Sequence, residues 1–156
     1  MAVGTGAGWV KHRLTLTLPD AALRQKAKTF IRSIIDYAGP FGAPAIIGSM
    51  QGRWGGDVAR EKGLEMLAEA VGELGNYAKQ YRVPLLFEPL NRYETNFVST
   101  VEAGMELLKK SGSDNVRLLC DLFHMNIEEQ DIATSLRRAG KLLGHVHLAQ
   151  QQDSPW

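Results

Sequence analysis

The chain has 156 residues, 44% of them apolar and 22% charged, which suits one domain with a hydrophobic core. Its net charge of +1 gives no long-range field to attract nucleic acid or an anionic membrane, and no apolar run is long enough to span a bilayer. The N-terminal stretch MAVGTGAGWV lacks a signal-peptide pattern, and the single cysteine excludes an internal disulfide, so we expect a cytoplasmic protein.

Amphipathic segments alternate with short apolar runs along the first half of the chain. A helix is expected to begin after Asp20, a good N-cap residue, and to stop at the Gly39-Pro40 pair. The apolar residues at helical spacing are Leu23, Ala27, Phe30, Ile31, Ile34, Ile35 and Ala38. A buried strand over 43–49, a glycine-rich loop over 51–56 and a second helix over 57–81 are expected to follow.

The same alternation continues in the second half. A helix is expected to open with a capping box made by Ser99 and Glu102 and to run to about Lys110. The other expected elements are strands over 83–88, 116–121 and 142–149 and a helix over 129–139. Strands that alternate with helices indicate an α/β fold with a parallel sheet covered by helices.

Three expected strands carry metal-binding side chains at or near their carboxyl ends. Glu88 ends one strand, Asp121 ends the next with His124 shortly after it, and the last strand contains His145 and His147. Ligands bind at this end of parallel strands, and carboxylates with imidazole suit Mn²⁺, Co²⁺, Mg²⁺ or Zn²⁺. His145 and His147 should face one side, with His147 the better ligand because it lies nearer the strand end. Taken singly, an Asp or Glu at a strand end is more often a helix cap or a loop contact than a metal ligand, and it is the occurrence of such side chains on three successive strands that favours a metal site.

Four motifs carry a resemblance to a known family: GAPAIIGSMQGRWG, FEPLNRYE, DLFHMNIEE and GHVHLA. In order and spacing they resemble the sugar isomerase/epimerase superfamily with the xylose-isomerase-like TIM barrel. The nearest members by motif are the ketose 3-epimerases, of the D-tagatose and D-psicose 3-epimerase type, and hydroxypyruvate-isomerase-like proteins. The resemblance runs from about Val10 to Ala149.

The resemblance implies a role for five residues within these motifs. Glu88 matches a metal ligand that is also the catalytic acid/base, and Asp121 and His147 match two further metal ligands. Glu94 and His124 match contacts to substrate oxygens. The implied reaction is proton transfer next to a carbonyl of a sugar or sugar phosphate, through an enediolate stabilised by a divalent metal, most often Mn²⁺, Co²⁺ or Mg²⁺.

The chain departs from the family at both ends. The stretch LAQQQDSPW has no match to the last barrel strand, which carries the second catalytic carboxylate, and MAVGTGAGWV resembles the third strand. We therefore expect a truncated (β/α)8 barrel of about five strands over 1–149, followed by a polar tail over 150–156. A closed barrel needs about 250 residues, and an open one has exposed edges, so we expect a homo-oligomer. A non-catalytic relative that binds metal or sugar weakly is the alternative.

Several other features of the sequence give weaker signals. Trp54 lies in the glycine-rich loop and is assigned to sugar stacking, with packing as the alternative. Cys120 is expected to be an inert core thiol, and Asn91 and Arg92 are expected to stabilise their loop. An endonuclease IV-type phosphodiesterase is disfavoured because the chain has four histidines and little net charge. A flavodoxin-like sheet fits the strand-helix alternation but leaves the motifs unexplained.

Overall fold

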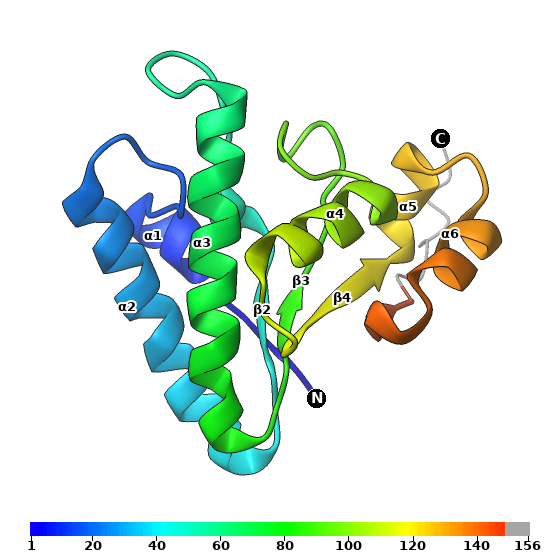
Figure 1. The fold of residues 1–156 in the computed structure, drawn as a ribbon, viewed down its shortest axis with the longest axis horizontal. Helices are drawn as coiled ribbons and strands as arrows, with labels where there is room; N and C mark the ends of the chain where they lie inside the picture. The colour runs from blue at the N-terminus through cyan, green and yellow to red at the C-terminus, as the bar shows by residue number, and fades with distance from the viewer. Residues whose placement is uncertain (149–156) are drawn as a thin grey trace, which may run out of the picture.

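A five-stranded parallel sheet forms the centre of the chain (Figure 1). The computed structural model describes residues 1–148, so the predicted polar tail lies outside the described residues. The strands are β1 (Val3–Gly4), β2 (Ala45–Ile47), β3 (Leu85–Phe87), β4 (Val116–Asp121) and β5 (Leu143–His147). They follow one another in the order β1-β2-β3-β4-β5, and every neighbouring pair is parallel. This is half of a β/α barrel, which confirms the predicted fold class.

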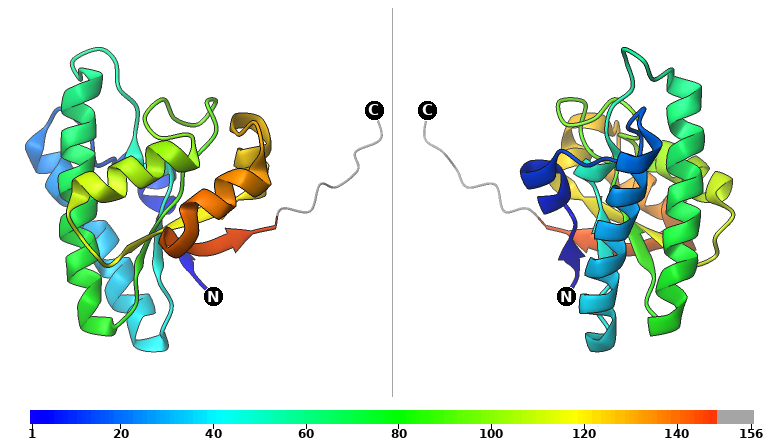
Figure 2. Two further views of the ribbon diagram at one scale, coloured as in Figure 1. Left: turned by 45° about the vertical axis from the view of Figure 1, so that its right-hand side comes forward. Right: turned by 90° about the vertical axis from the view of Figure 1, so that its left-hand side faces the viewer.

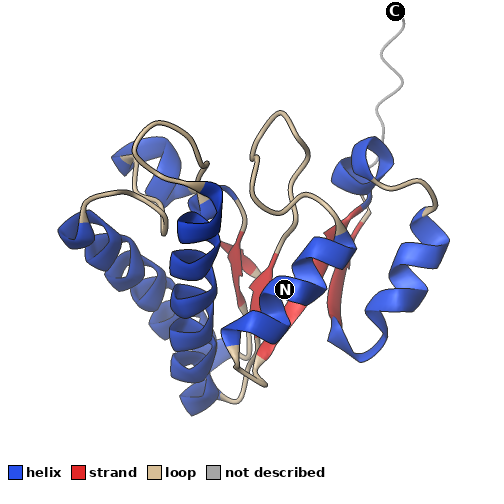
Figure 3. Cartoon of the chain, turned by 45° about the horizontal axis from the view of Figure 1, so that its top comes forward, coloured by secondary structure: helices blue, strands red, loops and turns tan. Residues whose placement is uncertain are grey.

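Helices connect successive strands and cover one face of the sheet (Figures 1 and 3). The α-helices are α1 (Ala7–His12), α2 (Ala21–Ala38), α3 (Arg60–Ala78), α4 (Val101–Ser111), α5 (Leu122–Glu128) and α6 (Ile132–Ala139). Short 3-10 turns are η1 (Gly39–Phe41), η2 (Ser49–Gln51), η3 (Lys79–Tyr81) and η4 (Gly140–Leu142). Within the described part of the chain, no helix combines the length and apolar character that crossing a membrane requires.

The two faces of the sheet carry separate sets of apolar side chains, because alternate strand residues point to opposite sides. The outer face packs under the helices and contributes Ile47, Phe87 and Leu118 to the main core. The inner face holds a small second cluster made of Ile46, Leu86 and Leu119. Any residue in phase with Leu86 or Leu119 therefore projects toward the inside of the half-barrel.

The helix starts show where sequence expectation and structure differ. Asp20 caps α2 as predicted, accepting hydrogen bonds from two backbone N–H groups. The cap of α4 is Thr100 and the prediction of Ser99 was wrong by one residue: the Thr100 hydroxyl accepts from the N–H of Ala103. A second N–H of this helix, that of Val101, donates to the Glu129 carboxylate at 2.7 Å.

Two helices lie where the sequence analysis expected none. Both α1 and α5 are short, with 6 and 7 residues, so neither contains enough turns to display a helical repeat. The helix expected over 129–139 begins only at Ile132, because Asp131 is its N-cap and accepts from the N–H of Thr134. Likewise, α3 starts at Arg60 rather than at 57, since Val58 forms a bridge with Gly55 in the preceding loop.

Candidate metal centre

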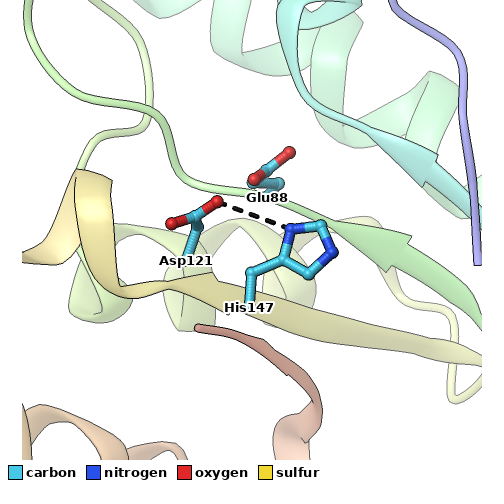
Figure 4. A group of neighbouring side chains, drawn as sticks. All are labelled: Glu88, Asp121 and His147. Carbon is cyan, nitrogen blue, oxygen red and sulfur yellow. Dashed lines mark ion pairs between the residues drawn. The ribbon is translucent and has the colours of Figure 1, made fainter. Parts of the chain in front are cut away.

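Three side chains converge at the carboxyl ends of β3, β4 and β5 (Figure 4). Glu88 directly follows β3 and continues its ladder, since its N–H donates to the Ile47 carbonyl at 2.9 Å. Asp121 and His147 end β4 and β5 and are register partners across the two strands. All three are in phase with the inner face. One ligand atom from each lies within 4.8 Å of the other two, and Nδ1 of His147 is 3.4 Å from Oδ2 of Asp121.

A bulge between β4 and β5 sets this register. Leu118 pairs with Leu143, but the next residue, Leu119, pairs with His145, so Gly144 is left without a partner. A Cβ at Gly144 would lie 2.5 Å from the Cβ of Arg117, which is too close for any other residue. The glycine thus allows β5 to approach β4 and places His145 and His147 on the inner face, as predicted from strand alternation.

The Glu88 carboxyl group lies in a setting that disfavours its charge. Its side chain is 15% exposed, and among the described residues no group donates a hydrogen bond to it. Burial raises the pKa of Glu88 to about 7, and the nearby carboxylates of Asp121 and Glu94 add to the increase. Gly48 keeps space beside it, because a Cβ there would lie 2.8 Å from Oε2 of Glu88. A buried acid without donors, next to a second acid and an imidazole, fits a divalent cation.

Asp121 has two neighbours, one for each carboxylate oxygen. Oδ1 accepts a hydrogen bond of 2.8 Å from the N–H of Phe123 and caps α5. Oδ2 is turned to His147 on the neighbouring strand. The helix-cap interpretation and the ligand interpretation of this acid are therefore compatible, because the cap fixes the carboxylate while leaving one oxygen for a cation.

His124 and Glu94 lie beside this cluster. His124, on α5, is 8% exposed, and its Nε2 is 3.9 Å from Oε1 of Glu88. Glu94, in the loop after β3, has a half-exposed side chain with Oε1 3.9 Å from Nδ1 of His124. Asn91 lies between these two groups and is 2% exposed. Sequence reasoning assigned Asn91 to loop stability only and missed its contact with the histidine; its position inside the motif that joins Glu88 to Glu94 was the available signal.

The other candidates have structural contacts of their own. The indole N–H of Trp54 donates to the Asn96 carbonyl at 2.7 Å, which ties together the loops after β2 and β3, and the residue remains 40% exposed. Arg92 forms an ion pair with Glu128 and so ties the loop after β3 to α5. Cys120 is buried on the outer face, and burial raises the pKa of its thiol to about 11, as suits an unreactive core residue.

Fold and cluster together define a class: a β/α half-barrel with two carboxylates and an imidazole at the carboxyl ends of adjacent strands. The family model described as xylose isomerase-like TIM barrel matches residues 2–155, and the chain belongs to that family. Among relatives, it is 33% identical over 136 residues to the D-psicose 3-epimerase of Ruminiclostridium cellulolyticum, covering 85% of this chain and 46% of that protein. It is 30% identical over 157 residues to the D-psicose 3-epimerase of Agrobacterium fabrum, covering 94% and 51%.

Solved structures give the same relationship. The D-psicose 3-epimerase of Clostridium cellulolyticum H10, solved with D-tagatose, superposes with a TM-score of 0.76 at 30% identity. The match covers 85% of this chain and 47% of that one. The chain thus spans about half the length of the relatives it matches.

Proposed function

We propose that this chain carries the metal-binding and proton-transferring part of a divalent-metal-dependent ketose 3-epimerase. The observation that carries the proposal is the convergence of Glu88, Asp121 and His147 within 4.8 Å at the carboxyl ends of three strands. Its relatives of the ketose 3-epimerase kind support the choice of substrate, a small ketose or its phosphate. Mn²⁺, Co²⁺ and Mg²⁺ suit the two carboxylates best, and Zn²⁺ is an alternative.

Each residue of the cluster has a separate task in this proposal. Glu88, Asp121 and His147 would hold the cation, which when bound would supply positive charge close to the substrate's oxygens. Glu88 removes a proton from the carbon next to the carbonyl, as a carboxylate that lies beside the substrate can do as a general base. His124 and Glu94 orient the sugar by hydrogen bonds to its oxygens, and Trp54, which is 40% exposed, stacks on the sugar ring.

A calorimetric Mn²⁺ titration of EDTA-treated protein tests the metal site. We expect 1:1 binding in the wild type and at least a tenfold loss of affinity in His147→Ala. His145→Ala is the matched control, since it removes an imidazole from the same strand and face but outside the cluster, and it should bind Mn²⁺ normally. Equal affinity in all three proteins would exclude His147 as a ligand.

Deuterium exchange tests the chemistry. With metal and D-psicose in D₂O, the wild type should incorporate deuterium at the carbon next to the carbonyl, as followed by NMR. Glu88→Gln should abolish the exchange while Asp121 and His147 retain part of the metal affinity. Full exchange by Glu88→Gln would show that another group removes the proton.

Binding without turnover is the second candidate function. Epimerisation needs a proton donor on the opposite face of the sugar, and within residues 1–148 the cluster has only three members, all of which are assigned to the metal. Metal binding in the titration together with no deuterium exchange, in wild type and variant alike, would favour this function.

Two further proposals concern the chain as a whole. Self-association of the half-barrel is supported by its two edge strands, β1 and β5, each of which pairs on one side only within the described residues. A cytoplasmic location is supported by the single, buried cysteine. Cell fractionation would test the location, and recovery in an extracellular or membrane fraction would contradict it.

A further inference from the structure

We infer that Asn91 is a positioning residue that fixes the proton of neutral His124 on Nε2, so that this histidine presents an N–H donor to the metal centre. Asn91 is 2% exposed and lies in the loop after β3, 33 residues from the histidine along the chain. The role that His124 then has in catalysis rests on the proposed function. The position of the proton on His124 does not depend on the proposed function and is tested separately.

The orientation of the Asn91 amide follows from its neighbours. The backbone N–H of Tyr93 is 3.0 Å from one amide atom, and because an N–H can only donate, that atom is the oxygen. The opposite atom is therefore the NH₂ group, which has two hydrogens and two acceptors in reach. These are Oε1 of Glu94 at 3.3 Å and Nδ1 of His124 at 2.8 Å.

The state of the imidazole follows from the amide. Two donors point at Nδ1 of His124: the Asn91 side chain at 2.8 Å and the Asn91 backbone N–H at 3.2 Å. A nitrogen that accepts hydrogen bonds cannot carry a hydrogen, so the proton of the neutral ring is on Nε2. The Asn91 amide also separates Nδ1 from Glu94, whose oxygen is 3.9 Å away and makes no hydrogen bond with the ring.

This arrangement limits what His124 can do. Its Nε2 lies 3.9 Å from Oε1 of Glu88, which is too long for a hydrogen bond, so the Nε2–H has no acceptor among the described residues and is available to a ligand oxygen. Without a lone pair on Nε2, His124 cannot act as a base toward the substrate. In the proposed reaction His124 therefore donates a hydrogen bond to a substrate oxygen, and proton transfer at carbon falls to Glu88.

Long-range ¹H–¹⁵N NMR of histidine-labelled full-length protein tests the inference, at pH 8 in EDTA and again with Mg²⁺, which is diamagnetic. The His124 signals are assigned by their loss in His124→Gln. We expect the Nε2–H tautomer in the wild type. Asn91→Asp keeps the acceptor for Tyr93 but replaces the NH₂ donor by an acceptor, so the His124 proton should move to Nδ1 or the ring should become doubly protonated.

Asn96→Asp is the matched control. Asn96 lies in the same loop as Asn91, but its side-chain amide forms hydrogen bonds with the backbone of Trp54 and not with a histidine. It should leave the His124 signals unchanged. If Asn91→Asp fails to fold, uncharged Asn91→Leu removes the side-chain donor and leaves only the longer backbone N–H contact at Nδ1, so the Nδ1–H tautomer should become detectable beside the Nε2–H tautomer. A wild-type proton on Nδ1, or an unchanged tautomer in the folded Asn91 variants, would overturn the inference. Since no step uses activity, an inactive protein would contradict the proposed function and leave this result intact.

Discussion

At the scale of single residues, Glu88 shows how the fold holds an acid in an unfavourable setting. The carboxyl group is largely buried, lies near Asp121 and Glu94, and receives no hydrogen bond from the described residues. Its ionised form is therefore less stable in the folded chain than in the unfolded one, where the pKa is about 4.5. A bound cation would reverse this preference, which is how a metal centre and protein stability become linked.

Glu88→Gln should therefore stabilise the metal-free protein at alkaline pH. Below pH 4.5 Glu88 is protonated in both the folded and the unfolded state, so it does not lower the stability of the wild type. As the pH rises from 4.5 to about 7, the unfolded chain ionises first and the wild type loses stability, whereas the glutamine variant does not. Urea unfolding in EDTA should show a difference that favours the variant, grows through this window and reaches about 3 kcal/mol above it.

Saturating Mn²⁺ provides the control for this result. The ion should stabilise the wild type more than Glu88→Gln, because only the wild type offers the full ligand set. A variant that is less stable than the wild type at pH 8 in EDTA would contradict the raised pKa of Glu88.

At the scale of elements, strong periodicity and reliable caps explain what the sequence analysis predicted. The strands β2 to β5 and the helices α2, α3 and α4 all lie within or close to their expected ranges. The expected strand ends also bring Glu88, Asp121 and His147 near one another in the structure, because strand alternation and the bulge between β4 and β5 turn all three to the inner face. For Asn91 the sequence offers only its position in the motif that joins Glu88 to Glu94, because its burial and its contact with His124 are created by the tertiary fold.

Two substitutions at the start of α4 test whether Thr100 or Ser99 caps this helix. Thr100→Ala should cost about 1 kcal/mol of unfolding free energy, because its hydroxyl accepts the hydrogen bond from Ala103. Ser99→Ala removes a neighbouring hydroxyl that makes no hydrogen bond among the described residues, so it should change stability by less than about 0.5 kcal/mol. Chemical denaturation of both variants measures the two values. The reverse ranking would restore the capping box that the sequence analysis expected.

The bulge in β5 is the element that aligns His147 with Asp121. Gly144→Ala adds a Cβ that would meet the Cβ of Arg117 at 2.5 Å, so β5 must shift relative to β4. We expect a loss of Mn²⁺ affinity of at least tenfold although every ligand residue is still present. Gly4→Ala is the matched control in β1, where a Cβ meets nothing within 4 Å. Unchanged affinity in Gly144→Ala would show that the register is not needed for the centre.

At the scale of the whole molecule, the half-barrel has two strands with an unpaired side within residues 1–148. Figure 2 shows β5 running along one edge, and β1 occupies the other. The backbone of β1 alternates: Val3 and Thr5 donate their N–H groups inward, to the carbonyls of Pro44 and Ile46. Gly4 lies between them, so its N–H points to the open edge. An edge strand with a free donor is a site for pairing with a second copy.

Gly4→Pro tests this edge without disturbing the β1–β2 ladder. Proline lacks the outward N–H but leaves the inward donors of Val3 and Thr5 in place. If copies of the chain pair through β1, sedimentation velocity at micromolar concentration should show oligomers in the wild type and in Gly4→Ala, and monomers in Gly4→Pro. A wild type that stays monomeric would refute self-association. Oligomers in all three proteins would instead place the contact away from β1, and β5 would then be the edge to block.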